Sequence, residues 1–144
     1  APPHLADGPA VSRTGRRDTV SGGLLPQPWV EVDGQRVLLD HALGTDYAVV
    51  VAGAPDPALV AAAEGAGIPL VQVSATAPAH VVDRDGVLLD WLRRTGTGAV
   101  LVRPDHVVET RAPHRKDGAQ GGALVERIRS RGLSRRLAVH RAAS

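Results

Sequence analysis

One short stretch of the chain holds His80, Asp83 and Asp85, and Ser74 lies a few residues before it. Imidazole and carboxylate groups at this spacing could bind a metal ion, and with the serine they could form a hydrolytic Ser-His-Asp arrangement. The segment from Asp83 to Gly86 is also typical of a turn, because Asx-type side-chain bonding and a glycine suited to a left-handed backbone fall together. No glutamate closes a twelve-residue loop that starts at Asp83, which argues against an EF-hand. We therefore interpret Asp83, Asp85 and Gly86 as a structural turn that leads into a helix.

Cofactor chemistry within the chain is not expected. The chain has no cysteine, which excludes disulfides, thiolate catalysis and cysteine-ligated metal centres. No Gly-x-Gly-x-x-Gly follows a strand pattern, so neither FAD nor NAD(P)H has a fingerprint here. The segment Gly53–Pro57 at the start of a predicted helix could attract an anion. There Pro57 removes an N–H donor and Asp56 can cap the helix, so capping is favoured.

A second polar group follows the buried run Ala99–Val102, where Arg103, Pro104 and Asp105 precede another strand pattern at Val107–Thr110. Proline presets φ for the first corner of a β-turn. We predict an antiparallel hairpin in which the aspartate bonds the turn backbone and the arginine finds a carboxylate or carbonyl partner. These three residues are also interpreted as structural, and no catalytic, cofactor-binding or metal-binding residue is assigned.

The elements that would hold these turns alternate between strand and helix patterns from Tyr47 onward. The predicted strands are Tyr47–Val51, Leu70–Val73, Ala99–Val102 and Val107–Thr110, and the predicted helices are Ala58–Ala66, Val87–Thr95 and Ala123–Arg131. Short crossovers make the first two strands parallel, while the proline turn makes the last two antiparallel. The order β-α-β-α-β-β-α predicts an α/β, thioredoxin-like fold with a central mixed sheet flanked by helices.

The beginning of the chain carries weaker signals. Residues 1–23 are rich in Gly, Pro, Ser and Arg, which predicts a linker or extended arm outside the core. Residues 24–30 are apolar but broken by prolines, as in an extended edge segment. Valines on both sides of Asp33-Gly34 predict a hairpin, and Leu39–Gly44 predicts one helical turn. We expect an arm at 1–23, the domain at 24–131 and a basic tail at 132–144.

Composition narrows the possible partners. Apolar residues make up 43% of the chain and aromatics 2%, so the core must consist of Val, Leu and Ala, with Trp29, Tyr47 and Trp91 as large pieces. Residues 111–144 hold 9 Lys and Arg against 2 Asp and Glu, but no aromatic residue to stack on bases, so a solvated helix face is favoured over nucleic-acid binding.

The chain has no membrane-length apolar run and no secretory leader, which favours a cytoplasmic protein. Because methionine is absent, a fragment of a longer chain is expected.

Several short segments carry a resemblance to a known family. Gly23–Val30 resembles its opening Gly-x-x-x-Pro-Gln segment, whose first glycine by spacing is Gly22. Leu39–Tyr47 resembles its Leu-Asp-x-x-Gly-x-x-Phe stretch, with one more residue before the glycine and tyrosine for the aromatic. Asp83–Gly86 and Leu101–Asp105 resemble later segments, although His106 stands where many relatives carry glycine. Over roughly residues 22–110 the chain resembles the C-terminal thioredoxin-like domain of FAD-dependent class A aromatic-ring hydroxylases, and it is most similar to the 3-(3-hydroxyphenyl)propionate and phenol hydroxylase branch.

This resemblance implies a non-catalytic structural domain at the end of a flavoenzyme. FAD, NAD(P)H and the phenolic substrate would belong to upstream domains of the same polypeptide, which would be its partners, and a homodimer is also implied. Two alternatives stay open: a free-standing, cysteine-less thioredoxin-like protein-binding module, and a basic RNA- or protein-binding adaptor that uses residues 111–141.

Overall fold

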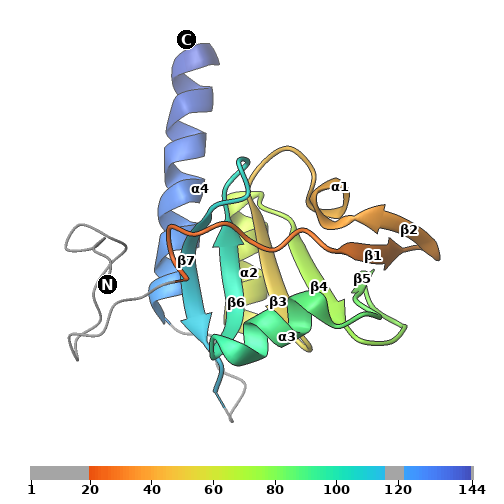
Figure 1. Cartoon of the computed structure of the whole chain (residues 1–144). Helices are drawn as coiled ribbons and strands as arrows, with labels where there is room; N and C mark the ends of the chain where they lie inside the picture. Colours follow the sequence, from red (N-terminus) through yellow and green to blue (C-terminus); the bar gives the residue numbers. More distant parts are fainter. Residues whose placement is uncertain (1–19, 116–121, 144) are drawn as a thin grey trace.

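The computed structural model describes residues 20–115 and 122–143, and the strands within these ranges form one mixed sheet. Figure 1 shows the sheet between two layers of helices. The strands are β1 (Trp29–Val32), β2 (Gln35–Leu38), β3 (Ala48–Ala52), β4 (Leu70–Ser74), β5 (Val81–Val82), β6 (Thr97–Val102) and β7 (Val108–Pro113). The helices are α1 (Leu39–Leu43), α2 (Pro57–Ala66), α3 (Val87–Arg94) and α4 (Gly122–Ala143). The strand order across the described sheet is β2-β1-β5-β4-β3-β6-β7.

Two apolar clusters lie on opposite faces of the sheet, because successive strand residues point to opposite sides. On β3, Val49 and Val51 belong to the cluster beneath α2 and α4, together with Leu59 and Ile128. Val50 of the same strand belongs to the other cluster, which α1 and α3 cover. Aliphatic side chains thus supply most of the core, as the composition predicts.

The sheet confirms the predicted directions of pairing. β3 and β4 are parallel, whereas β6 and β7 are antiparallel. β1 and β2 form the predicted hairpin, and its turn places Asp33 at φ 51 and Gly34 at φ 78. Helix α2 starts at Pro57, where the Asp56 side chain accepts a hydrogen bond from the N–H of Ala58. The thioredoxin-like arrangement predicted from the order of elements is therefore present.

The last helix is longer than predicted. It does not end at Arg131 but continues to Ala143, so the described part of the expected basic tail is helical. Gly132 does not terminate the helix, and it lies in close contact with α2. A Cβ atom at this position would come within 2.7 Å of the Cα and Cβ of Ala66. This glycine allows close packing between two helices rather than a turn.

The start of the domain also differs from the prediction. Val20 is only 5% exposed and belongs to the core, although residues 1–23 were expected to lie outside it. The N–H of Gly22 donates to the carbonyl of Val108 (2.7 Å), and the N–H of Val108 donates to the carbonyl of Gly23 (2.8 Å). These bonds attach the segment to β7. The rest of the expected arm, residues 1–19, lies outside the described residues.

Two smaller features were missed. The short strand β5 lies between β4 and β1, where its two valines are buried. Trp29 was expected in the core, but it lies on the outer face of the β1–β2 hairpin and is 47% exposed. Tyr47 and Trp91 are partly buried against the two clusters. The core therefore relies on large aromatics even less than predicted.

Candidate functional site

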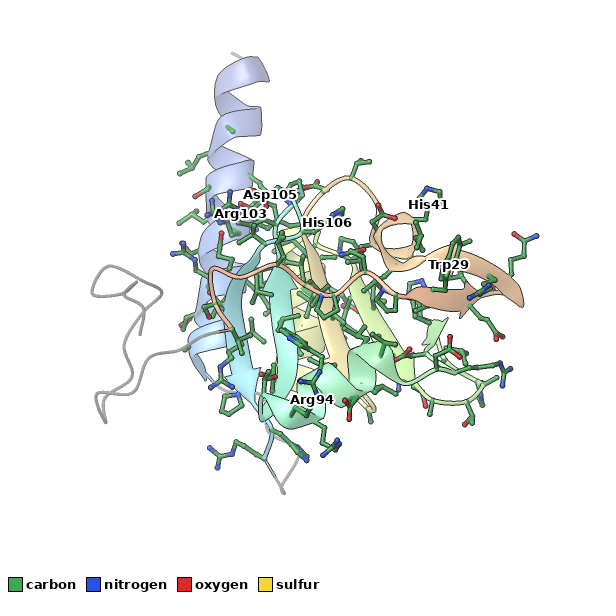
Figure 2. All side chains as sticks on the ribbon, viewed as in Figure 1. Trp29, His41, Arg94, Arg103, Asp105 and His106 are labelled. Carbon is green, nitrogen blue, oxygen red and sulfur yellow. The ribbon has the colours of Figure 1, made fainter. Side chains whose placement is uncertain are left out.

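The turn between β6 and β7 contains Arg103, Pro104 and Asp105, and Figure 2 shows Arg103 and Asp105 near each other. A guanidinium nitrogen of Arg103 lies 2.7 Å from Oδ2 of Asp105, while Oδ1 accepts from the N–H of Val107 (3.3 Å). The N–H of His106 donates to the carbonyl of Arg103 (2.9 Å), which closes the turn. His106 has φ 67, a conformation that favours glycine. The polar groups of this turn thus bond to one another.

The turn before α3 buries Asp83, with one carboxylate oxygen bonded to the helix and the other, Oδ1, without a hydrogen-bond partner among the described residues. Asp83 is 0% exposed, and its Oδ2 accepts from the N–H of Leu89 (2.8 Å) in the first turn of the helix. Its own N–H donates to the carbonyl of Ser74 (2.8 Å). Gly86 adopts φ 73 immediately before the helix. Asp83 therefore caps α3, whereas Asp85 stays exposed at the surface.

Neither the metal site nor the Ser-His-Asp arrangement considered from the sequence is assembled among the described residues. His80 is exposed, and Ser74 contributes its carbonyl to the Asp83 backbone bond. Among the described residues no group of three or more His, Cys, Asp or Glu side chains could hold a metal ion. In the segment Gly53–Pro57, the Asp56 carboxylate accepts a hydrogen bond (3.1 Å) from the N–H of Ala58 at the start of α2. The carboxylate thus holds one of the donors that an anion would need there and repels another anion, which favours capping.

Sequence patterns did not reveal the ionic cluster between β7 and α4. Glu109, whose side chain is 8% exposed, accepts from Arg131 (2.6 and 3.0 Å) and from Arg127 (2.8 Å). The Arg131 guanidinium also lies 5.1 Å from the centroid of the Tyr47 ring. Burial raises the pKa of Glu109, but the hydrogen bonds from both arginines outweigh it, so the pKa lies below its ordinary value. Hydrogen bonding to this carboxylate raises the pKa of Arg131. The cluster holds α4 on the sheet.

A half-open hollow of about 270 Å³ lies where α3, the start of β6 and the end of β7 meet. Leu89, Leu92 and Pro113 contribute apolar surface to it, and Arg93 lies at its rim. Arg93 is already paired with Asp90, and hydrogen bonds from Arg93 and Arg94 hold the pKa of Asp90 below its ordinary value. This hollow could admit a small group, but it assembles no catalytic pair.

The reactive side chains described above are engaged in turns, caps and ion pairs. The family is identified instead by comparison with known proteins. Residues 22–126 match the model of the HcaD C-terminal domain family. The chain belongs to this family. A search of curated proteins found no match. The matched range starts in the segment that pairs with β7 and ends within α4, so the HcaD C-terminal domain here includes the whole sheet.

Solved structures share the fold of this HcaD C-terminal domain. One is aklavinone-11 hydroxylase in a ternary complex with FAD and aklavinone, with 21% identity over 79% of this chain and 21% of that chain, at a TM-score of 0.53. Another is the flavin-dependent monooxygenase PieE with FAD and substrate, with 23% identity over 93% of this chain and 24% of that chain, at a TM-score of 0.56. The chain spans between a fifth and a quarter of the length of these two proteins.

A third neighbour is the thioredoxin domain of a thiol-disulfide oxidoreductase from Bacteroides vulgatus. It is 16% identical over 76% of this chain and 96% of that chain, with a TM-score of 0.51. The fold is therefore thioredoxin-like. In the described residues, no helix combines the length and apolar character needed to cross a membrane.

Proposed function

We propose that this chain is the non-catalytic C-terminal structural domain of an FAD- and NAD(P)H-dependent aromatic monooxygenase that hydroxylates a phenolic ring. The family match over residues 22–126 carries the proposal. The two flavin-dependent neighbours support it, since a domain of this fold occupies only 21% and 24% of their chains. In this proposal the remaining residues of the longer polypeptide bind FAD, NAD(P)H and substrate.

A structural role for this chain is supported by how its polar side chains are used. Asp83 caps a helix, Arg103 and Asp105 bond within one turn, and Glu109 ties two elements together. Asp56 holds the N–H that an anion at α2 would need. None of these groups is directed at a shared reactive point. We propose that FAD binds to the upstream region and that this region is the partner of the domain.

The substrate branch and location follow the sequence resemblance. We propose a phenolic substrate of the 3-(3-hydroxyphenyl)propionate type and a cytoplasmic enzyme. Gly23–Val30 is the segment of this chain that most resembles that branch, and Leu101–Asp105 is the segment that most specifically resembles the family.

Three measurements test the proposal. Titration of the isolated chain with FAD or NADPH, followed by fluorescence, should show no saturable binding. The longer polypeptide should take up FAD and oxidise NAD(P)H when 3-(3-hydroxyphenyl)propionate is added. Asp83→Asn, which keeps an oxygen for the N–H of Leu89, serves as a probe inside the domain. It should leave turnover per folded molecule unchanged. Saturable micromolar flavin binding by the isolated chain, or a tenfold loss of turnover with unchanged melting, would contradict a structural role.

A further inference from the structure

Within the described residues, the apolar cluster beneath α2 and α4 does not extend to one end of the sheet. Its strand residues come from β3, β6 and β7, with Leu70 of β4 at its border, and it includes none from β1, β2 or β5. Pairing register places other residues on this face. Glu31 is paired with Arg36 and with Val82, and residues two apart on a strand share a face, which adds Trp29. Figure 1 shows the β1–β2 hairpin at the edge of the sheet opposite α4.

We call Trp29, Glu31, Arg36 and Arg84 the hairpin face. These residues surround a shallow hollow of about 160 Å³. The Trp29 ring, labelled in Figure 2, is 47% exposed. The Arg36 guanidinium lies 4.8 Å from the ring centroid, and Arg84 forms an ion pair with Glu31. An exposed tryptophan beside arginines, around a hollow, has the composition of the energetic centre of a protein interface.

The charges of the hairpin face indicate what would complete it. Arg84 already has the Glu31 carboxylate. The Arg36 side chain makes no ion pair or hydrogen bond with any described residue, and its guanidinium lies over the Trp29 ring. A partner would therefore bring a carboxylate to Arg36 and an apolar side chain to the hollow. Because the ring and the guanidinium are already stacked, binding would cost little side-chain entropy.

We propose that the hairpin face is the surface on which the FAD- and substrate-binding region of the same polypeptide packs, an inference that rests on the proposed function. The length of chain outside the structure favours this occupant. In the two flavin-dependent neighbours, a chain like this one covers only 21% and 24% of the polypeptide, so a large covalently linked region must meet the domain somewhere. Covalent linkage gives that region a high effective concentration at any complementary surface.

Hydroxyl-radical footprinting with mass spectrometry tests this inference. The isolated chain and the FAD-loaded longer polypeptide are oxidised under the same dose. Trp29 should be oxidised on the order of tenfold more slowly in the longer polypeptide, because the centre of an interface excludes water. Leu133 is 52% exposed on α4 and serves as an internal reference whose oxidation should not change. Equal oxidation of Trp29 in both samples would overturn the inference.

A charge reversal tests the proposed carboxylate contact. Arg36→Glu in the longer polypeptide should restore rapid oxidation of Trp29, whereas Arg36→Lys should retain most of the protection. Arg94→Glu is the matched control, because Arg94 is exposed on α3 and its partner Asp90 keeps Arg93. Far-UV circular dichroism of each variant verifies that it folds. Protection that survives Arg36→Glu would overturn the contact between Arg36 and a carboxylate.

Three further outcomes separate this inference from its alternatives. Protection of Trp29 in the isolated chain that rises with concentration, together with a dimer mass, would assign the face to a second copy and overturn the proposal. An FAD-loaded polypeptide with freely oxidised Trp29 would refute only the hairpin face. A longer polypeptide that takes up no FAD would instead contradict the proposed function.

Discussion

The two ends of the sheet differ in how much of the same face is covered. At the β7 end, α4 covers the strands, Ile128 is 0% exposed, and Glu109 is held by two arginines. At the β1–β2 end, Trp29 is 47% exposed and Arg36 has no carboxylate among the described residues. One end is complete within the domain, and the other carries groups that a partner could complete.

This difference means that one end of the sheet contributes to the stability of the isolated fold and the other is available for recognition. Buried aliphatic contacts and ion pairs of low exposure stabilise the fold by themselves. Exposed aromatic and cationic side chains contribute little until they are desolvated, which happens at an interface. Substitutions at the β7 end should therefore affect the isolated chain, whereas those at the hairpin face should matter mainly in the longer polypeptide.

The largest effect is expected from Ile128→Ala. The side chain is fully buried between α4 and the sheet, so its truncation should lower the free energy of unfolding by about 2–5 kcal/mol. Leu133→Ala on the same helix is the control and should change it by less than about 0.5 kcal/mol, because Leu133 is largely exposed. Urea denaturation measures both. Equal losses would show that α4 is not anchored by its buried face.

The next effect concerns Glu109→Gln. Loss of the carboxylate leaves Arg127 and Arg131 without their partner and should cost about 1–3 kcal/mol at neutral pH.

Its pH dependence follows from the lowered pKa of Glu109. The carboxylate stabilises the fold above its ordinary pKa of 4.5, and this contribution is lost as the pH falls through the lower value of the folded state. The difference in melting temperature between wild type and variant should therefore shrink below pH 4.5. A difference that stays constant across this range would rule out the ionic contribution.

A smaller effect is expected at the turn between β6 and β7. Asp105→Ala removes the acceptor for the N–H of Val107 and the partner of Arg103, which should lower stability by about 0.5–2 kcal/mol. Asp105→Asn keeps an oxygen and should recover part of this. Thermal melting follows both variants. In the proposed longer enzyme, turnover per folded molecule should stay nearly unchanged, since the side chains of Arg103 and Asp105 bond within the turn. A melting temperature equal to that of wild type would refute the role of this side chain in the turn.

The smallest effect on the isolated chain should come from Trp29→Ala. The variant loses a half-exposed ring and its contact with Arg36, worth about 0.5–1 kcal/mol at a surface site. The same substitution in the longer polypeptide should cost more, because the ring would be buried there. Chemical denaturation of both forms makes the comparison, and equal costs would contradict the assignment of an interface to this end.

Local signals account for most of the elements that the sequence predicted. β3 is a continuous apolar run, α2 starts with an aspartate cap and ends at Gly67 in a left-handed conformation, and Asp33-Gly34 forms a hairpin turn. Each of these depends on neighbouring residues. The Arg103–Asp105 turn and the Asp83 cap are equally local in their bonding.

The features that escaped prediction depend on residues far apart in the chain. Val20 is buried because its segment pairs with β7, and Glu109 meets arginines 18 and 22 residues later. Trp29 looks like a core residue by type, but its exposure is set by its place on a part of the sheet face that the cluster beneath α2 and α4 does not reach. Helix α4 continues past Gly132, and this glycine lies against Ala66. A local pattern cannot distinguish such a glycine from one that ends a helix.

Gly132 also fixes the position of α4 along α2. α4 can approach Ala66 this closely only at a residue without a side chain. The residues on either side of Gly132 therefore cannot take its place in this contact. From this point α4 runs on to Ala143, about 16 Å at the rise of an α-helix. One residue inserted between Ile128 and Gly132 would rotate everything beyond it by about 100° and remove the glycine from its contact. The direction in which the projecting end leaves α2 therefore depends on a position without a side chain.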